Sequence, residues 1–344
     1  MGFMVRFAGP REVDLHEYPD APLAPHEVRI RTLYSGVSAG TELTVYRGSN
    51  PHLAKRWDAS RRLFVDDAVE IEYPVEGWGY EEVGEVVELG AEVGRVAEGD
   101  VVWGAWGHRS TAVLAEADAA DRLLGHDVDP VLGIFSLIGA IALNVVLDAD
   151  IHVGDWVAVF GQGPPGLIAS QLARLNGGTV VAVDAIPARL ELARGLGADH
   201  VLNATRRPAA EEIKVLTEGR GADVSIEFSG SYRALHEAIR STVYSGRVVS
   251  AGFFQGGGAG LFLGEEFHHN RIQVVCSQIL GVDARFSYRW DERRLRRTVM
   301  GLVGASRLDL KPLVSHVFPV DRAAEAFRLL DEHPEQAVQV VLQF

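Results

Sequence analysis

The stretch Gly154–Asp184 reads GDWVAVFGQGPPGLIASQLARLNGGTVVAVD, and its order of residue types decides the fold of the chain. It predicts a strand at Trp156–Phe160, a glycine turn at Gly161–Gly166, a helix, and a second strand, Val180–Val183, that ends at an acid. The last glycine of the turn and Asp184 are 18 residues apart. This is the layout of a dinucleotide-binding unit.

Each glycine of the turn has a separate role in that interpretation. Gly161 permits the tight turn, Gly163 lets the backbone approach a pyrophosphate, and Gly166 lets the helix lie close to the strand. The helix then presents unpaired N–H groups to the phosphates. Pro164 and Pro165 remove two donors, but proline suits the first helical turn, where N–H groups have no partner inside the helix. The alternative is an ordinary glycine turn; the flanking helix and buried strand favour the dinucleotide.

The acid at the end of the second strand predicts the type of cofactor. Asp184 is expected to accept hydrogen bonds from the adenosine ribose hydroxyls, and its charge would repel a 2′-phosphate. NAD is therefore favoured over NADP. Arg189 lies close enough in sequence to keep NADP open as an alternative.

Composition bounds the rest of the interpretation. The chain has 344 residues, 47% of them hydrophobic, which is enough for two domain cores. Its net charge of −14 disfavours nucleic acid and acidic membranes as partners. The apolar segments are short and interrupted and the start lacks a signal peptide, so we expect no membrane span and a cytoplasmic protein. The single cysteine excludes an intrachain disulfide and a four-cysteine zinc site.

The order of predicted elements gives the fold class. Residues 1–125 are β-rich, with a long polar insert at Tyr46–Asp67 that is expected to be a loop. After Asp184, strands and helices alternate as far as a strand at Arg271–Leu280. This alternation predicts an α/β fold, with a Rossmann-type doubly wound parallel sheet and a separate β-rich domain.

Ligand groups are expected at the carboxyl ends of the parallel strands. Besides the glycine turn and Asp184, the candidate cofactor contacts are Ser229, Gly252 and Phe253, together with Ser277 in the last strand of that sheet. Cys276, inside the same apolar strand, is expected to be a buried small residue.

Three further stretches carry a family resemblance: Ser35–Glu42, Gly79–Val87 and Glu266–Gln278. With the glycine turn, they make the chain resemble the medium-chain dehydrogenase/reductase superfamily almost end to end. More narrowly, they resemble its zinc-free branch, typified by bacteriochlorophyllide a dehydrogenase.

The resemblance implies a domain organisation. A discontinuous, β-rich (GroES-like) catalytic domain would comprise residues 1–135 and 279–344, and the dinucleotide-binding domain residues 136–278. It also implies a homodimer joined through edge strands near Arg271–Leu280.

The departures from zinc alcohol dehydrogenases concern the metal. Their cysteine, histidine and second cysteine positions correspond here to Ser38, Tyr80 and a residue near Ser136. Hydroxyl groups are poor zinc ligands compared with thiolate or imidazole. None of the twelve histidines lies in an H-x-x-x-H or comparable pattern. We therefore expect no zinc and no other metal.

Without zinc, hydrogen-bond donors or a general acid must stabilise the oxygen that gains charge during hydride transfer. Tyr80 is the first candidate, and Thr41 the second, with Ser38 beside them. Glu42 and Glu81 are candidates to orient these hydroxyls or to raise their pKa. The alternatives are structural: Tyr80 fills the vacated metal pocket, and Thr41 satisfies a turn.

Two residues of the polar insert, His52 and Lys55, are further candidate proton donors, the alternative being a solvated loop. The resulting hypothesis is a zinc-independent, NAD(P)-dependent oxidoreductase that interconverts a secondary alcohol and a ketone in a small-molecule substrate. An NADPH-dependent enoyl or quinone reductase is the first alternative, and a non-catalytic nucleotide-binding protein the second.

Overall fold

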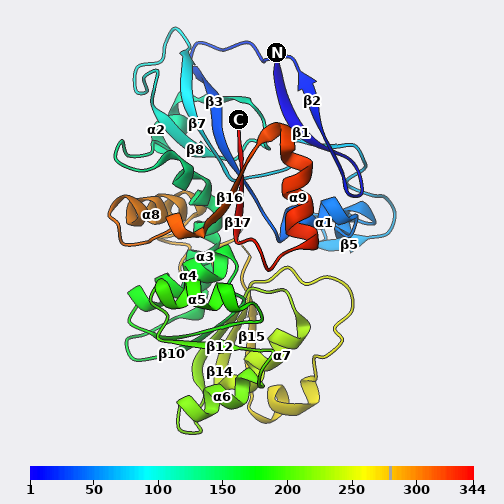
Figure 1. The fold of residues 1–344 in the computed structure, drawn as a ribbon, viewed down its shortest axis with the longest axis vertical. Helices are drawn as coiled ribbons and strands as arrows, with labels where there is room; N and C mark the ends of the chain where they lie inside the picture. Colours follow the sequence, from blue (N-terminus) through cyan, green and yellow to red (C-terminus); the bar gives the residue numbers. More distant parts are fainter. Residues whose placement is uncertain (279–280) are drawn as a thin grey trace. The chain divides into compact units, whose positions relative to one another are not determined.

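The computed structural model describes residues 1–278 and 281–344, and contacts between Cα atoms divide the chain into two units (Figure 1). The first unit is Met1–Leu137 with Leu313–Phe344, and the second is Ile138–Pro312. The predicted boundary between residues 278 and 279 adjoins residues 279–280, which lie outside the described residues. Contact clustering draws that boundary at Pro312 instead, so the predicted domain limits stay a prediction.

The second unit is built on a parallel sheet of six strands, in which each strand pairs with its neighbours in parallel register. In spatial order they are β12 (His200–Asn203), β11 (Thr179–Asp184), β10 (Trp156–Phe160), β13 (Ala222–Glu227), β14 (Thr242–Ser250) and β15 (Gln273–Cys276). The chain order reverses on either side of β10. The glycine turn follows β10, at the point where ligands bind in sheets of this kind.

Helices cover both faces of this sheet. They are α3 (Phe135–Ala149), α4 (Pro164–Leu175), α5 (Pro187–Gly195), α6 (Ala209–Leu216) and α7 (Tyr232–Ser241). The second unit also contains a π turn, η3 (Leu263–Phe267), and α8 (Glu292–Gly304). Successive residues of β10 serve opposite faces: Ala158 packs in the core with α6 and α7, and Val157 in the core with α3 and α4. This confirms the predicted parallel sheet with helices on both faces.

The first unit is β-rich. Its main sheet has the order β16 (Val314–Pro319), β17 (Gln339–Gln343), β3 (Glu27–Val37), β7 (Glu82–Leu89) and β8 (Val101–Gly104), with β9 (Thr111–Ala115) also paired to β3. A second sheet has the order β2 (Glu12–Tyr18), β1 (Gly2–Gly9) and β6 (Val75–Glu76). These mixed sheets confirm the predicted β-rich domain.

Short helices complete the first unit. They are α1 (Thr41–Arg47), α2 (Glu116–Asp121) and α9 (Ala323–Glu332), with 3-10 turns η1 (Pro51–Leu53), η2 (Pro130–Ile134) and η5 (Val320–Arg322). A further 3-10 turn, η4 (Lys311–Leu313), spans the boundary between the two units. The core between the sheets and α9 is aromatic: Phe327 packs edge-on against Phe7, with ring centroids 5.1 Å apart, and lies beside Tyr46.

Three expectations are corrected. The insert Tyr46–Asp67 is not a loop throughout, because β4 (Arg56–Asp58) and β5 (Leu63–Val65) form an antiparallel hairpin within it. Cys276 is exposed rather than buried, because β15 is the last strand of its sheet. The predicted strand Arg271–Leu280 is shorter as observed, and its end at residues 279–280 lies outside the described residues.

One helical stretch, Pro130–Ala149, has the length and composition of a membrane span, with a mean hydropathy of 2.3. The expectation that every apolar segment is short and interrupted was wrong for this stretch. However, 72% of its apolar window is buried within the protein. Such burial is typical of the core helix of a globular domain.

Candidate functional site

The glycine turn has the geometry that each of its residues predicts. Gly161 has φ of +91°, and Gly163 is the N-cap of α4, with Pro164 and Pro165 in the first helical turn. A Cβ on Gly166 would lie 1.8 Å from the Gly161 carbonyl oxygen. Only glycine fits there, because the first turn of α4 packs directly on the turn that precedes it.

Asp184, at the end of β11, is 9% exposed and already holds this turn in place. Its Oδ2 accepts a hydrogen bond from the backbone N–H of Gln162 (2.6 Å), and its Oδ1 from that of Ile186 (2.8 Å). Each carboxylate oxygen keeps a lone pair for a further donor. Burial lowers the pKa of Arg189 on α5, and the charge of Asp184 opposes that shift, so the two side chains act on one another.

The turn after β13 lies against the glycine turn, and the turn after β14 lies against the turn after β13. A Cβ on Gly161 would lie 2.8 Å from the backbone nitrogen of Ser229. A Cβ on Gly252 would lie 2.3 Å from the backbone nitrogen of Gly230, and Phe253 is 43% exposed beside it. The structure thus brings together the predicted cofactor residues of three strand ends.

A buried acid that we did not predict fastens these turns. Glu227, the last residue of β13, has no exposed surface. Its Oε1 accepts from the Ser229 backbone N–H (2.7 Å) and from the Ser229 hydroxyl, and its Oε2 accepts from the Gly230 N–H (3.1 Å). Burial raises the pKa of Glu227 to about 7, although these donors oppose the rise. No sequence pattern pointed to Glu227, because it is one polar residue among several in a strand.

Ser277 follows β15 and is buried. Its backbone N–H donates to the Ser250 carbonyl (3.1 Å), and its hydroxyl accepts from the Asn144 side chain on α3 (3.3 Å). Asp148, one turn further along α3, lies near this serine, which opposes the rise that burial causes in the pKa of Asp148. The Ser277 hydroxyl is therefore engaged with α3.

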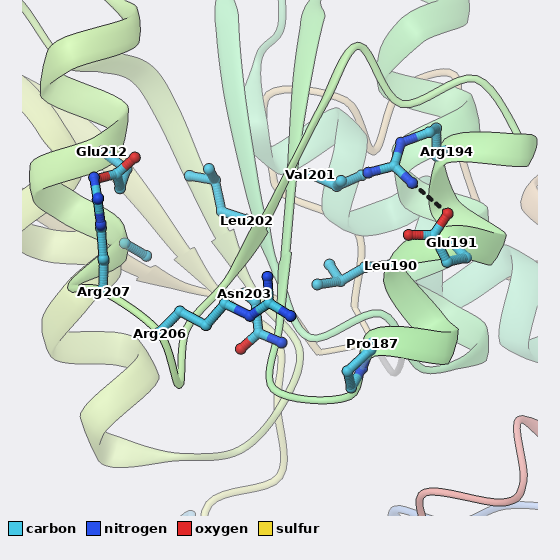
Figure 2. Close-up of a pocket in the computed structure, with 11 residues that line it drawn as sticks. Pro187, Leu190, Glu191, Arg194, Val201, Leu202, Asn203, Arg206, Arg207 and Glu212 are labelled. Atoms are coloured by element: carbon cyan, nitrogen blue, oxygen red, sulfur yellow. Dashed lines mark hydrogen bonds and ion pairs between the residues drawn. The ribbon is translucent and has the colours of Figure 1, made fainter.

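A hollow of about 260 Å³ lies at the β12 edge of the same sheet (Figure 2). Figure 2 shows Leu190 of α5 and Leu202 of β12 at its apolar wall. Its charged rim is paired internally, Arg194 with Glu191, and Arg207 with Glu212. None of the predicted cofactor residues is in its lining, so this hollow is separate from the glycine turn.

In the first unit, two candidate catalytic hydroxyls lie together. The Tyr80 hydroxyl donates to Ser38 Oγ at 2.5 Å, and it also interacts with the Thr41 hydroxyl at the start of α1. Burial raises the pKa of Tyr80, and the charges of Glu81 and Glu42 raise it further. At neutral pH, Tyr80 is therefore a protonated hydrogen-bond donor.

Four fully buried ionisable residues lie next to this hydroxyl pair: Glu42, Glu81, Glu82 and His108. His108 Nε2 is 2.7 Å from Glu42 Oε2, and the Ser38 backbone N–H donates to Glu42 Oε1 (3.1 Å). Burial raises the pKa of Glu81 well above its usual range, and the neighbouring acids add to this. Sequence reasoning singled out Glu42 and Glu81 but missed His108, which lies 66 residues from Glu42 in the chain.

The acids near Tyr80 are held by the first unit itself. The Gln339 side chain on β17 donates to Glu81 Oε2 (3.2 Å), whereas Glu81 Oε1 is buried with no hydrogen-bond partner among the described residues. The Ser136 hydroxyl is likewise buried without a described partner. The three positions that the resemblance assigns to zinc ligands, Ser38, Tyr80 and a residue near Ser136, stay a prediction.

The structure brings together one group with metal-like spacing that the sequence pattern did not predict. His236 on α7 and Glu265 and Glu266 in η3 have ligand atoms within 4.8 Å of one another. Glu266 is also paired with Arg240, at 3.2 Å, and that cation competes with a metal for its carboxylate. The expectation that no metal binds stays a prediction.

The two insert residues named as candidate proton donors are engaged elsewhere. His52 Nδ1 is 2.7 Å from Glu70, and Lys55 pairs with the exposed Asp66 at 3.1 Å. Both fasten the β4–β5 hairpin, where Trp57 packs edge-on against Phe64. These contacts account for both side chains without a reaction.

Comparison with known proteins gives the family. The family model described as "Zinc-binding dehydrogenase" matches residues 164–292. The D-guloside 3-dehydrogenase of Escherichia coli (strain K12) is 32% identical over 343 residues, covering 97% of this chain and 98% of that protein.

Solved structures agree over the full length. The 2R,3R-butanediol dehydrogenase of Bacillus subtilis superposes with a TM-score of 0.79 at 22% identity, covering 100% of both chains. A dehydrogenase from Sinorhizobium meliloti 1021, solved with NADP, gives 0.79 at 20% identity, covering 100% of this chain and 99% of that one. Together with the fold and the glycine turn, these comparisons show that the chain belongs to the medium-chain dehydrogenase/reductase superfamily of zinc-binding type and is an alcohol-dehydrogenase-like member of it.

Proposed function

We propose that the protein is a zinc-independent, NAD(P)-dependent oxidoreductase that interconverts a secondary alcohol and a ketone by hydride transfer. The observation that carries this proposal is the Tyr80–Ser38 hydroxyl pair, at 2.5 Å, in the positions that correspond to metal ligands in zinc alcohol dehydrogenases. It supplies a neutral donor where those enzymes supply a Lewis acid.

The residues present do not fit zinc. Protein zinc sites are built from thiolate, imidazole and carboxylate ligands. Here two of the three corresponding side chains are hydroxyls that hydrogen-bond to one another, and the third position falls near Ser136, whose hydroxyl is buried without a partner among the described residues. The mismatch supports the zinc-free branch that resembles bacteriochlorophyllide a dehydrogenase, and no step of the proposed reaction passes through a metal.

The residues of the second unit do fit a nicotinamide dinucleotide. The glycine turn leaves no space for a Cβ on Gly166. No described side chain caps the N-terminus of α4 at Gly163, and Asp184 keeps lone pairs to accept hydrogen bonds from ribose hydroxyls. When bound, the cofactor supplies or accepts the hydride. Asp184 favours NAD, while Arg189 beside it keeps NADP as the alternative.

Tyr80 and Ser38 act on the oxygen of the substrate in this proposal. Negative charge develops on the ketone oxygen as its carbon receives hydride, and a neutral Tyr80 hydroxyl donates a hydrogen bond to it. In the structure the Tyr80 proton is donated to Ser38 Oγ. In this step the Tyr80 O–H turns from Ser38 to the ketone oxygen, and the Ser38 hydroxyl then donates to the phenol oxygen. Thr41 provides a second hydroxyl close to it. The raised pKa of Tyr80 keeps this donor protonated in ordinary assay buffers.

The relatives support a hydroxylated substrate. The E. coli relative is named for position 3 of a D-guloside, and the B. subtilis structure for a butanediol. Both names describe compounds with secondary alcohols. We infer that the substrate of this protein is a polyol or sugar-like secondary alcohol.

Turnover tests the proposal. The full chain is incubated with NAD or NADP and a panel of polyols and glycosides, and with NADH or NADPH and ketones and enones. Oxidation of secondary alcohols together with reduction of the matching ketones is the expected result. Turnover of enones alone would establish the enoyl or quinone reductase instead, and cofactor binding without any turnover would favour a non-catalytic protein.

We further propose a homodimer through the exposed edge of β15, where Val274 and Cys276 are exposed on a strand that pairs, among the described residues, with β14 alone. Light scattering tests this, and a monomer at assay concentration would refute it. The cytoplasmic location, the lack of nucleic-acid partners and the lack of a membrane partner stay predictions.

A further inference from the structure

We propose that His108 is a positioning residue of the hydroxyl pair: a buried, doubly protonated imidazolium that fixes Glu42 as a carboxylate and, through Glu42, sets the position of Ser38 and Tyr80. The inference rests on the proposed function for the reaction that these hydroxyls serve. It is carried by the contacts of the His108 ring and by its backbone conformation.

Both ring nitrogens of His108 face groups that accept hydrogen bonds. Nε2 lies 2.7 Å from Glu42 Oε2, and Nδ1 lies 2.5 Å from Ser35 Oγ. The Ser35 hydroxyl donates its own proton to Glu82 Oε1 (3.1 Å), so it has only lone pairs left for His108. The ring must then donate from both nitrogens, which requires the imidazolium.

The charges around the ring favour the same state. Burial opposes a charge on His108, but the Glu42 and Glu82 carboxylates outweigh it and raise the pKa of His108. Glu82 also accepts from the His108 backbone N–H (3.0 Å) and from the Trp106 N–H (2.6 Å). Burial raises the pKa of Glu82, while His108 opposes the rise. Among the described residues, Glu81 and Tyr80 also interact with this cluster, and the pKa of each is raised.

Two contacts join His108 to the hydroxyl pair. Glu42 receives the Ser38 backbone N–H at Oε1 (3.1 Å), and its own backbone N–H donates to the Ser38 carbonyl (3.2 Å). On the other side, Gly79 lies directly against the ring: a Cβ there would be 2.7 Å from His108 Nε2. The ring thus holds the backbone of Ser38 and the residue that precedes Tyr80.

The backbone of His108 is itself in a sparsely populated conformation. Its φ is +47°, in the left-handed region that disfavours a side chain. Such a conformation persists only where the surroundings enforce it, and it is common at functional sites. A neutral or smaller residue at this position would lack the contacts with Glu42 and Ser35 that hold the His108 side chain.

The first experiment measures the protonation of the ring and needs no activity. Long-range ¹⁵N–¹H NMR of histidine-labelled full chain is recorded between about pH 6 and pH 9, across the usual range of histidine titration. We expect the His108 ring, assigned by its absence in His108→Gln, to have both nitrogens protonated at pH 7. A neutral tautomer at pH 7 for that ring would overturn the proposal.

The second experiment tests positioning through kinetics. Removing a group that orients active-site residues typically lowers activity about 10- to 100-fold. We expect His108→Gln and Glu42→Gln each to lower kcat in that range while leaving the Kd of NADH unchanged, and the double variant to be no worse than either single variant. The exposed His152→Gln is the matched control.

Unchanged kcat in His108→Gln, or additive losses in the double variant, would overturn the positioning role. If His108→Gln does not fold, Glu42→Gln provides the test. The proposal requires that in this variant the His108 ring loses a proton in the NMR spectrum and that kcat falls. A ring that stays doubly protonated together with an unchanged kcat would refute the proposal. A wild-type protein that binds NADH but turns over no alcohol or ketone would refute the proposed function, while the NMR result still reports the state of His108.

Discussion

Glu227 provides a prediction whose magnitude follows from the structure. Its carboxyl is fully buried, and burial raises its pKa from the usual 4.5 to about 7. An acid with a raised pKa in the folded state favours folding when protonated, so its contribution is present below pH 4.5 and is lost as the pH rises through 7. At about 1.4 kcal/mol per pKa unit, the free energy of unfolding falls by about 3 kcal/mol over that window.

The substitution Glu227→Gln removes this titration. The side-chain NH₂ of the introduced glutamine cannot accept the hydrogen bond that Glu227 Oε2 accepts from the Gly230 N–H. Loss of this bond lowers the free energy of unfolding by about 1–3 kcal/mol at every pH. Relative to wild type, however, the variant should gain about 2–3 kcal/mol in free energy of unfolding between about pH 5 and pH 8. The exposed Glu218→Gln is the control.

Guanidinium chloride unfolding of the full chain, followed by circular dichroism and tryptophan fluorescence at each pH, measures the difference. The slope with pH carries the test, because the lost hydrogen bond contributes only a constant offset. A difference that does not change with pH, or that falls as the pH rises, would refute the assignment of Glu227 as a buried acid that titrates near neutrality.

Three further substitutions test the two sites. Tyr80→Phe should lower kcat by about 100-fold or more with cofactor affinity retained, as expected for the loss of one hydrogen-bond donor to the developing oxyanion. Wild-type turnover of this variant in steady-state kinetics would mean that Tyr80 has a structural role only. Gly166→Ala should abolish NADH binding in a fluorescence titration, because its Cβ would lie 1.8 Å from the Gly161 carbonyl oxygen. Asp184→Ala should weaken NAD more than NADP in the same titration, and equal losses would contradict its role at the ribose.

The fold could be predicted because its deciding signals are local. The glycine turn, the proline pair and the alternating strands and helices lie within short stretches, and each residue type constrains the backbone where it stands. The order of strands is set by packing across the sheet, and this explains the error at Cys276: its strand is apolar, but β15 is the last strand of its sheet.

The candidate sites were predicted less completely, for the same reason. Ser38 and Tyr80 were identified because their positions were matched, through the family resemblance, to those of metal ligands in zinc alcohol dehydrogenases. The structure places their hydroxyls 2.5 Å apart. His108 shows no local pattern, since its acidic partners lie 66 and 26 residues away in the chain. Glu227 looks like any polar residue of a strand until the turn folds over it.

Turnover by metal-free protein tests the central claim most directly. The chain is purified, treated with a chelator and analysed for zinc, and its oxidation of a secondary alcohol with NAD is measured before and after zinc is added back. Our account predicts zinc far below one atom per chain and a rate that neither chelation nor added zinc changes. One stoichiometric zinc, whose removal abolishes turnover and whose return restores it, would contradict the account.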